Sequence, residues 1–372
     1  MKYIPSSFFL FIRAAALGEG PPRLPPLEER AAALSLAKRY DLAPLLAEAM
    51  LSAGLDEGCP DHDAFLREQL TGVLRYTRQS EAEAGAEALL SAAGILYMPL
   101  KGAVLRALYP KPYLRTSCDT DYLLPKEECD RAVSLLTDKG GYTVLSATPH
   151  DVAVGIRGQV TLELHSALFE ERDRGAVCPS PFEGALTEGE SARRVMHPDY
   201  LLFYHIAHMA KHFSMGGCGL RPLVDLWLLE RGKTLSGGAI ELLRLSGLYR
   251  FYRAMHALSL SYFEGAPFDE GGEELHEYLL TGGLYGERER RLASEEKKKG
   301  GRRAYFLSRL FPPKASLEKR YPHMVGRPYL YPYYACRRLF SYFSSSDKKS
   351  QLSTLPKEQR ERERALFESL GL

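Results

Sequence analysis

Residues 114–124 read LRTSCDTDYLL and place two aspartates at the mouth of an apolar run. Strands disfavour aspartate, so the two carboxylates need a reason to be there. In a β-strand, residues i and i+2 point to the same face, so Asp119 and Asp121 project together while Thr120 turns away. Two carboxylates this close repel each other unless a positive group lies between them. The motif predicts either a site for a hard divalent cation such as Mg²⁺ or a turn in which aspartate oxygens accept backbone N–H bonds.

Short strands and helices alternate around this stretch. ILYMPL, at residues 95–100, predicts a buried strand, and AVLRALY predicts a helix that stops at Pro110. EECDRAVSLLTDKGG has the apolar periodicity of an amphipathic helix. YTVLSA, HDVAVGI and VTLELHSAL then follow as three strand candidates, with a hairpin turn expected at residues 157–159. This order predicts a small mixed sheet with helices packed on it.

Helical sequence flanks the sheet on both sides. A long region rich in alanine, leucine and glutamate precedes it, and HPDYLLFYHIAHMAKHF and LRPLVDLWLLERG begin the helical block that follows. The expected fold class is therefore α+β, a small mixed sheet between N-terminal and C-terminal helical regions. The expected division of the chain is an N-terminal helical region (1–93), an α/β core (94–190), a helical domain covering the cleft (191–264), and a linker with a C-terminal helical tail (265–372).

Composition narrows the class of protein. The chain has 372 residues, of which 45% are hydrophobic, as in an ordinary folded protein. Its net charge of +2, with acidic and basic residues well mixed, indicates neither a nucleic acid nor a membrane as partner. No apolar run approaches the roughly 20 residues that span a bilayer. The six cysteines form no C-x-x-C pair, which favours reduced thiols and a cytoplasmic location.

Further candidate site residues lie on either side of the aspartates. Upstream, LKGAVLRALY predicts a strand end, a glycine turn and a helix start. There Lys101 and the helix N-terminus could grip phosphate oxygens while Gly102 lets the backbone approach closely, or the segment is an ordinary turn. Arg115 is either a further phosphate ligand or a plain loop arginine. Downstream, alternation in VTLELHSAL puts Glu163 on the site face of its strand, as a third ligand, a general base or part of a solvated face.

The ordered motifs LKGAVLRALYP, R-x-x-x-D-x-D-Y-L-L, LELH, HIAHMAKH and LRPLVDL resemble the uncharacterised bacterial nucleotidyltransferase family of the DNA polymerase beta-like superfamily. The resemblance runs from about residue 94 to residue 232. It implies the small palm-like sheet of that superfamily, a nucleoside triphosphate (NTP) substrate and two Mg²⁺ ions. It implies no particular acceptor.

The resemblance also implies roles for single residues. Asp119 and Asp121 would ligate the metals, and Glu163 would take the third carboxylate position, where the superfamily more often has aspartate. Lys101 and Gly102 stand where the superfamily has a glycine-serine or glycine-glycine turn. The serine hydroxyl that commonly contacts the triphosphate is therefore absent.

The two helices predicted after the sheet carry the remaining candidates. His205, His208 and His212 form one stripe of the first helix, which predicts a zinc site, a polar wall of a nucleotide cleft or a packed interface. In the resembled family this helix faces the sheet, which makes His208 and Lys211 candidate nucleotide-binding residues. In the second helix, Arg221 and Asp225 are spaced i, i+4, so we expect them to pair with each other.

These observations predict a Mg²⁺-dependent nucleotidyltransferase. It would move a nucleoside monophosphate from an NTP, with ATP expected, to an unknown acceptor and release pyrophosphate. The acceptor could be a small molecule, a peptide or a protein. The alternative is a non-catalytic nucleotide-binding or regulatory module on the same fold, for which the missing serine is the main indication.

Overall fold

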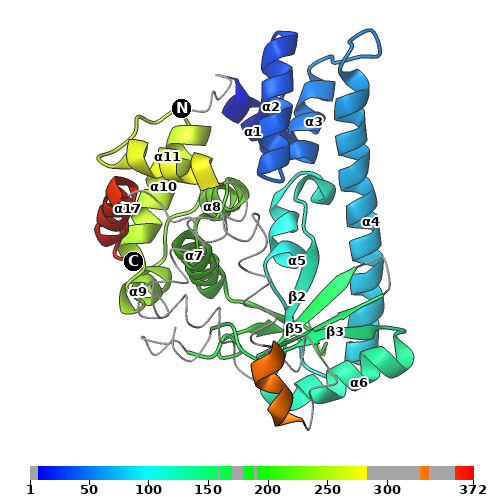
Figure 1. The fold of residues 1–372 in the computed structure, drawn as a ribbon. Coiled ribbons are helices and arrows are strands. Elements are labelled where there is room, and N and C mark those ends of the chain that lie inside the picture. The colour runs from blue at the N-terminus through cyan, green and yellow to red at the C-terminus, as the bar shows by residue number, and fades with distance from the viewer. Residues whose placement is uncertain are drawn as a thin grey trace.

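The computed structural model describes residues 7–148, 150–156, 160–169, 179–187, 191–282, 327–334 and 357–372. A mixed sheet and helix α6 lie at one end of the long helix α4, and helices α1 to α3 lie near its other end (Figure 1). The remaining labelled helices lie beside these two groups. No helix within the described ranges has both the length and the hydrophobicity needed to cross a membrane.

The main sheet has five strands in the order β1-β2-β5-β4-β3. Their bounds are β1 (Met98–Pro99), β2 (Asp119–Leu123), β3 (Thr143–Ala147), β4 (Asp151–Gly155) and β5 (Thr161–His165). Strand β2 pairs in parallel with β5, and the other neighbours pair antiparallel. The predicted mixed sheet is confirmed, although ILYMPL contributes only two residues to it. The predicted hairpin turn at residues 157–159 lies outside the described residues.

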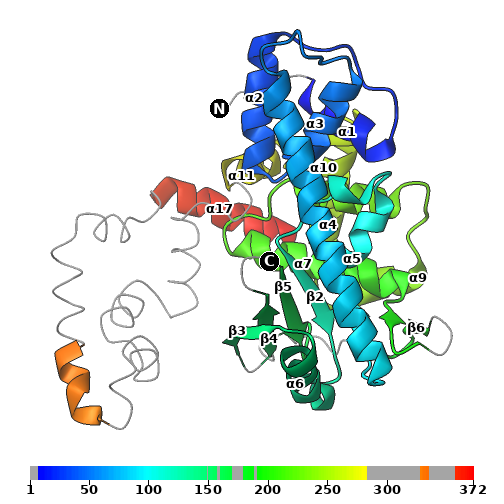
Figure 2. The same cartoon turned by 90° about the vertical axis from the view of Figure 1, so that its right-hand side faces the viewer.

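Four helices precede the sheet in the described part of the chain, and the last of them, α4, contacts it. They are α1 (Phe8–Leu17), α2 (Leu27–Arg39), α3 (Ala43–Ser52) and α4 (His62–Ala92). Helix α4 packs along α3 at one end and against β2 and α6 at the other (Figure 2). The chain leaves α4 through Gly94, which has a left-handed φ of 66° that suits glycine. One helix therefore connects the N-terminal helices to the sheet.

Further helices lie within and after the sheet, and α6 among them packs on the same face of the sheet as α4. They are α5 (Gly102–Leu105), α6 (Cys129–Lys139), α7 (Pro198–Ser214), α8 (Arg221–Glu230), α9 (Gly237–Leu245), α10 (Tyr249–Phe263), α11 (Gly272–Gly282) and α17 (Lys357–Leu370). A small two-stranded sheet, β6 (Leu186–Thr187) with β7 (Arg194–Val195), precedes α7. The predicted helix AVLRALY is broken into the four-residue α5 and a 3-10 turn.

Two hydrophobic clusters organise the molecule. The smaller cluster packs one face of the sheet, including Tyr122, Leu162 and Leu164, against α4 and α6. The larger cluster extends from Phe8 to Leu370 and includes residues of α1, α3, α7, α8, α10, α11 and α17. Buried residues of α11 and α17 thus belong to this core, while residues 283–326 and 335–356 of the expected linker and tail lie outside the described residues.

Two glycines in α4 give a matched test of its packing. A Cβ atom at Gly72 would lie 2.7 Å from Pro44 Cβ, whereas a Cβ at Gly85 would have nothing within 4 Å. Alanine is favoured over glycine in a helix by about 0.5–1 kcal/mol. We therefore expect Gly85→Ala to raise the free energy of unfolding by that amount and Gly72→Ala to lower it. Urea unfolding of both variants checks this, and stabilisation by Gly72→Ala would contradict the close contact with Pro44.

Candidate active site

A cavity of about 270 Å³ lies between the sheet and helices α7 and α8. All three predicted carboxylates, Asp119, Asp121 and Glu163, line it. Strand β2 places Asp121 directly opposite Glu163 on β5, and neighbouring residues of paired strands point to the same face. The apolar residues of β5 face the other way, into the smaller core. The alternation predicted for β5 is therefore confirmed.

Asp121 is the most deeply buried of the three carboxylates, with 2% of its surface exposed. Its Oδ1 atom accepts a hydrogen bond from Lys101 Nζ at 3.0 Å and lies 2.8 Å from His165 Nε2. Burial alone would raise the pKa of Asp121, but the bond from His165 and the charge of Lys101 outweigh it and lower the pKa to about 2. Burial lowers the pKa of His165, but its bonds to Asp121 and Glu163 outweigh it and raise the pKa to about 9. Asp121 is thus an anion with two cationic partners.

Asp119 lacks such compensation. Burial raises its pKa, and the nearby charges of Asp121 and Glu163 raise it further, against smaller opposing effects of Lys101 and Arg221. A cation bound near Asp119 would relieve this repulsion. Oxygen ligands of this kind suit a hard divalent ion, so the residues fit the metal that the sequence predicts.

A possible ligand cluster includes one residue that the sequence did not single out. Asp121, Glu163 and His165 offer ligand atoms that all lie within 4.8 Å of one another. In the described part of the chain, no other group of three or more such side chains lies close enough to hold a metal. His165 must be neutral to ligate a metal, and its raised pKa opposes that.

The turn before α5 is the segment for which the sequence predicts a phosphate grip. Lys101 has φ 41° and ψ −112°, a strained conformation for a residue with a side chain. A Cβ atom at Gly102 would lie 2.8 Å from Arg115 Nη1 and 2.9 Å from Ser117 Oγ. The close approach that Gly102 permits is therefore to these two side chains. Both Lys101 and Gly102 line the cavity.

Arg115 lines the same cavity but is held by a buried acid. Its Nε and Nη2 atoms donate to the two carboxylate oxygens of Asp225 at 3.1 and 2.9 Å, and Tyr109 Oη donates to Asp225 at 2.9 Å. Burial raises the pKa of Asp225, but the Arg115 charge outweighs it and the pKa is lowered. The predicted Arg221–Asp225 pair is wrong, because Asp225 faces Arg115 and Arg221 has another partner.

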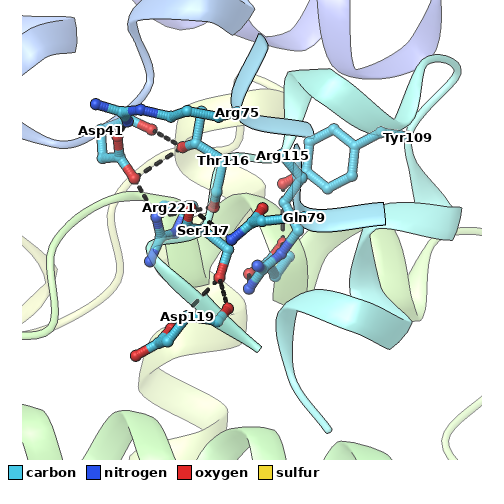
Figure 3. A network of polar contacts seen from close by, with 10 residues as sticks. Asp41, Arg75, Gln79, Tyr109, Arg115, Thr116, Ser117, Asp119 and Arg221 are labelled. Atoms are coloured by element: carbon cyan, nitrogen blue, oxygen red, sulfur yellow. Dashed lines mark hydrogen bonds and ion pairs between the residues drawn. The ribbon is translucent and has the colours of Figure 1, made fainter. Parts of the chain in front are cut away.

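The segment that leads into β2 is tied to distant parts of the chain (Figure 3). Thr116 Oγ1 donates to a carboxylate oxygen of Asp41 at 2.7 Å, and Arg221 Nη1 donates to Asp41 and, at 3.0 Å, to the Thr116 carbonyl. Gln79 Nε2 donates to the Ser117 carbonyl at 3.0 Å. The entrance to β2 is therefore clamped between the α2–α3 turn, α4 and α8.

The predicted histidine stripe of α7 lines the cavity. His205 Nε2 lies 2.9 Å from the Pro222 carbonyl, and His208 Nε2 lies 3.0 Å from His212 Nε2. Burial lowers the pKa of His208 well below its usual value, and the Lys101 charge lowers it further. Lys211 differs from its neighbours, because its side chain is exposed and does not line the cavity.

Three polar residues at or beside the cavity were not chosen as site residues from the sequence: His165, in the ligand cluster, and Tyr204 and Arg221, in the cavity lining. His165 was detectable, because it lies two residues after Glu163 on the same face of one strand. Tyr204 and Arg221 approach the carboxylates from α7 and α8, a proximity that no local pattern contains.

A double-mutant cycle tests which arginine pairs with Asp225. Breaking a buried ion pair typically costs about 3–5 kcal/mol, so Asp225→Asn should lower the free energy of unfolding strongly. We expect a coupling energy of about 1–3 kcal/mol between Arg115→Gln and Asp225→Asn and a clearly smaller one between Arg221→Gln and Asp225→Asn. Urea unfolding of the single and double variants measures both, and the reverse order would contradict the observed pairing.

A comparison with models of known protein families gives a match that includes the cavity. A family model described as an uncharacterised nucleotidyltransferase matches residues 27–263, from the first residue of α2 to the last residue of α10. This range contains every residue that lines the cavity. No curated protein matches the chain. Because the match covers more than half of its length, the chain belongs to this uncharacterised nucleotidyltransferase family.

Proposed function

We propose that this protein transfers a nucleoside monophosphate from an NTP to an acceptor and releases pyrophosphate, as enzymes of the DNA polymerase beta-like superfamily do. The observation that carries the proposal is the convergence of Asp119, Asp121 and Glu163 on one cavity. Family membership supports a nucleotide substrate, and ATP is the first to test. The acceptor in this proposal is a small molecule, a peptide or a protein.

The cofactor in this proposal is Mg²⁺, with two ions held by Asp119, Asp121 and Glu163. The buried, repelling carboxylates support it, since hard oxygen ligands match this ion. Held by these carboxylates, Mg²⁺ would supply Lewis acidity that lowers the pKa of an acceptor hydroxyl and positive charge that offsets the departing pyrophosphate.

The side chains around the cavity have separate tasks in the transfer. An acceptor oxygen forms a bond to the α-phosphorus as the bond from that phosphorus to the bridging oxygen breaks, and pyrophosphate leaves with the electron pair. Lys101 Nζ lies 3.0 Å from Asp121 and is the cation best placed to contact phosphate oxygens from the sheet side. Glu163 either accepts the acceptor's proton or acts only as a metal ligand. Arg115 and His208 line the walls, and Lys211, which is exposed, would act at the rim.

A second candidate function is a nucleotide-binding module without turnover. The specific observation that favours it is the pairing of Asp121 with both Lys101 and His165, which already supply positive charge at that carboxylate. Tight NTP binding without pyrophosphate release, under conditions that include Mg²⁺ and a cell extract, would identify the module.

The carboxylates provide the main test of catalysis. The full-length protein is incubated with Mg²⁺, each NTP labelled at the α-phosphate and a cell extract as source of the acceptor. We expect Asp121→Asn and Asp119→Asn to reduce label transfer and pyrophosphate release on the order of 100-fold or more, because each removes a charge that a metal needs. Asp138→Asn is the matched control, since Asp138 is exposed on α6 and does not line the cavity. Label transfer that survives Asp121→Asn would remove Asp121 from the mechanism.

Glu163→Gln separates the two roles open to Glu163. If Glu163 is only a metal ligand, the variant should lose Mn²⁺ affinity and transfer activity together. If Glu163 is the base, Mn²⁺ affinity should stay near that of the wild type while transfer falls by about 100-fold, the usual scale of general base catalysis. Electron paramagnetic resonance of Mn²⁺ measures the affinity without requiring activity. Full transfer activity in Glu163→Gln would exclude both roles.

A further inference from the structure

Two polar groups on the helical wall of the cavity lack protein partners. Tyr204, on α7, is only 5% exposed and lines the cavity, and its hydroxyl hydrogen bonds to no described residue. Arg221 begins α8, and its Nε atom is buried without a hydrogen-bond partner among the described residues. Buried polar groups are normally satisfied, so the buried Arg221 Nε is the exception here, while the Tyr204 hydroxyl opens on the cavity and is available to a ligand.

The two donors lie close to the predicted chemistry. Tyr204 lines the same cavity as Lys101, Asp121 and Glu163, and burial raises the pKa of its hydroxyl. Arg221 lines this cavity too, and its charge lowers the pKa of Asp119. Its Nη1 atom is engaged by Asp41 and the carbonyl of residue 116, so the side chain is held in place while Nε stays free.

Charge divides the cavity into two walls. The sheet side carries Asp119, Asp121 and Glu163, which repel an anion. On the side of α7 and α8, the one carboxylate among the described lining residues is Asp225, and Arg115 neutralises it. An anionic group of a ligand is therefore favoured on the helical wall, with cations between it and the sheet.

Helix α8 adds to this preference. Its first residues, Arg221 and Pro222, line the cavity, and it has ten residues with no acidic side chain in its first turn and no side-chain cap. No described residue accepts a hydrogen bond from the backbone N–H of Arg221. Pro222 has no N–H, and those of Leu223 and Val224 donate to the Leu220 carbonyl, so the Arg221 N–H is the free donor. This donor and the partial positive charge of a helix N-terminus both suit phosphate. Helix α5, with four residues, is too short to supply the same site.

We propose that Tyr204, Arg221 and the N-terminus of α8 form the subsite for the phosphate chain of the nucleotide. This inference rests on the proposed nucleotidyl transfer and specifies where its substrate is held. Tyr204 Oη and Arg221 Nε donate to phosphate oxygens, and Lys101 completes the grip from the sheet side. The subsite takes the place of the glycine-serine turn that the Lys101–Gly102 segment does not provide.

Tyr204→Phe gives the sharpest test, because it removes a hydroxyl that contacts no described residue. In the presence of Mg²⁺, calorimetry measures the affinity of the full-length protein for ATP, inorganic pyrophosphate and adenosine. We expect ATP and pyrophosphate to bind on the order of 10-fold more weakly, the usual effect of losing one hydrogen bond to a charged group, with adenosine binding and the melting temperature unchanged. Arg221→Lys, which keeps the charge but lacks Nε, should weaken the same two ligands.

Tyr262→Phe is the matched control. Tyr262 is as buried as Tyr204, but its hydroxyl lies 2.8 Å from His276 Nδ1 and it does not line the cavity. This variant should lose melting temperature and keep its affinity for ATP. Unchanged ATP and pyrophosphate affinity in both Tyr204→Phe and Arg221→Lys would overturn the subsite. A wild-type protein that binds pyrophosphate but no NTP would overturn the nucleotide function and leave an anion site, and binding of neither would overturn both.

Discussion

Three carboxylates on neighbouring strands repel each other, and the residues around β2 and β5 compensate for this repulsion unevenly. Asp121 keeps its charge because Lys101 and His165 both contact it. Asp119 has a weak 3.5 Å bond from the Ser117 hydroxyl and a raised pKa. The negative charge of Asp119, at the start of β2, is therefore only partly compensated by nearby cations. A cation that entered the cavity would therefore relieve most repulsion by approaching Asp119, the first residue of β2.

The position of β2 depends on contacts that are distant in sequence. The segment before it is held by Arg115 to Asp225, by Thr116 to Asp41 and by the Ser117 carbonyl to α4. Removing the Arg115–Asp225 charges from water carries a large desolvation cost, so a buried pair is weak evidence for added stability. Its contribution here is positional, because a bidentate pair fixes both distance and angle. Helices on both sides of the sheet therefore determine where the carboxylates point.

The alternation of residues within single strands predicted correctly which side chains of β2 and of β5 share a face. Period-two alternation was enough to put Asp119 with Asp121 and to separate Glu163 from its apolar neighbours. Asp121 and Glu163 come together because β2 and β5 pair in parallel. The sequence predicted a mixed sheet but not that these two strands are neighbours in it. The i, i+4 spacing of Arg221 and Asp225 misled because both side chains found partners more than 100 residues away. Tyr204 has the spacing of a core residue, and only the fold shows its hydroxyl at a cavity.

The turn at Lys101 has a strained backbone and directs a charged side chain toward the carboxylates. A lysine at φ 41° is strained, and such strain persists where surrounding contacts fix the residue. Here the ammonium group contacts Asp121, and the space beside Gly102 is filled by Arg115 and Ser117. The turn therefore contributes a side-chain cation to the cavity, which Gly102 also lines. A free backbone N–H, that of Arg221, and an unsatisfied guanidinium nitrogen occur at the start of α8, across the cavity. A phosphate chain held there would lie between the cations of both walls, with its negative charge directed away from the carboxylates.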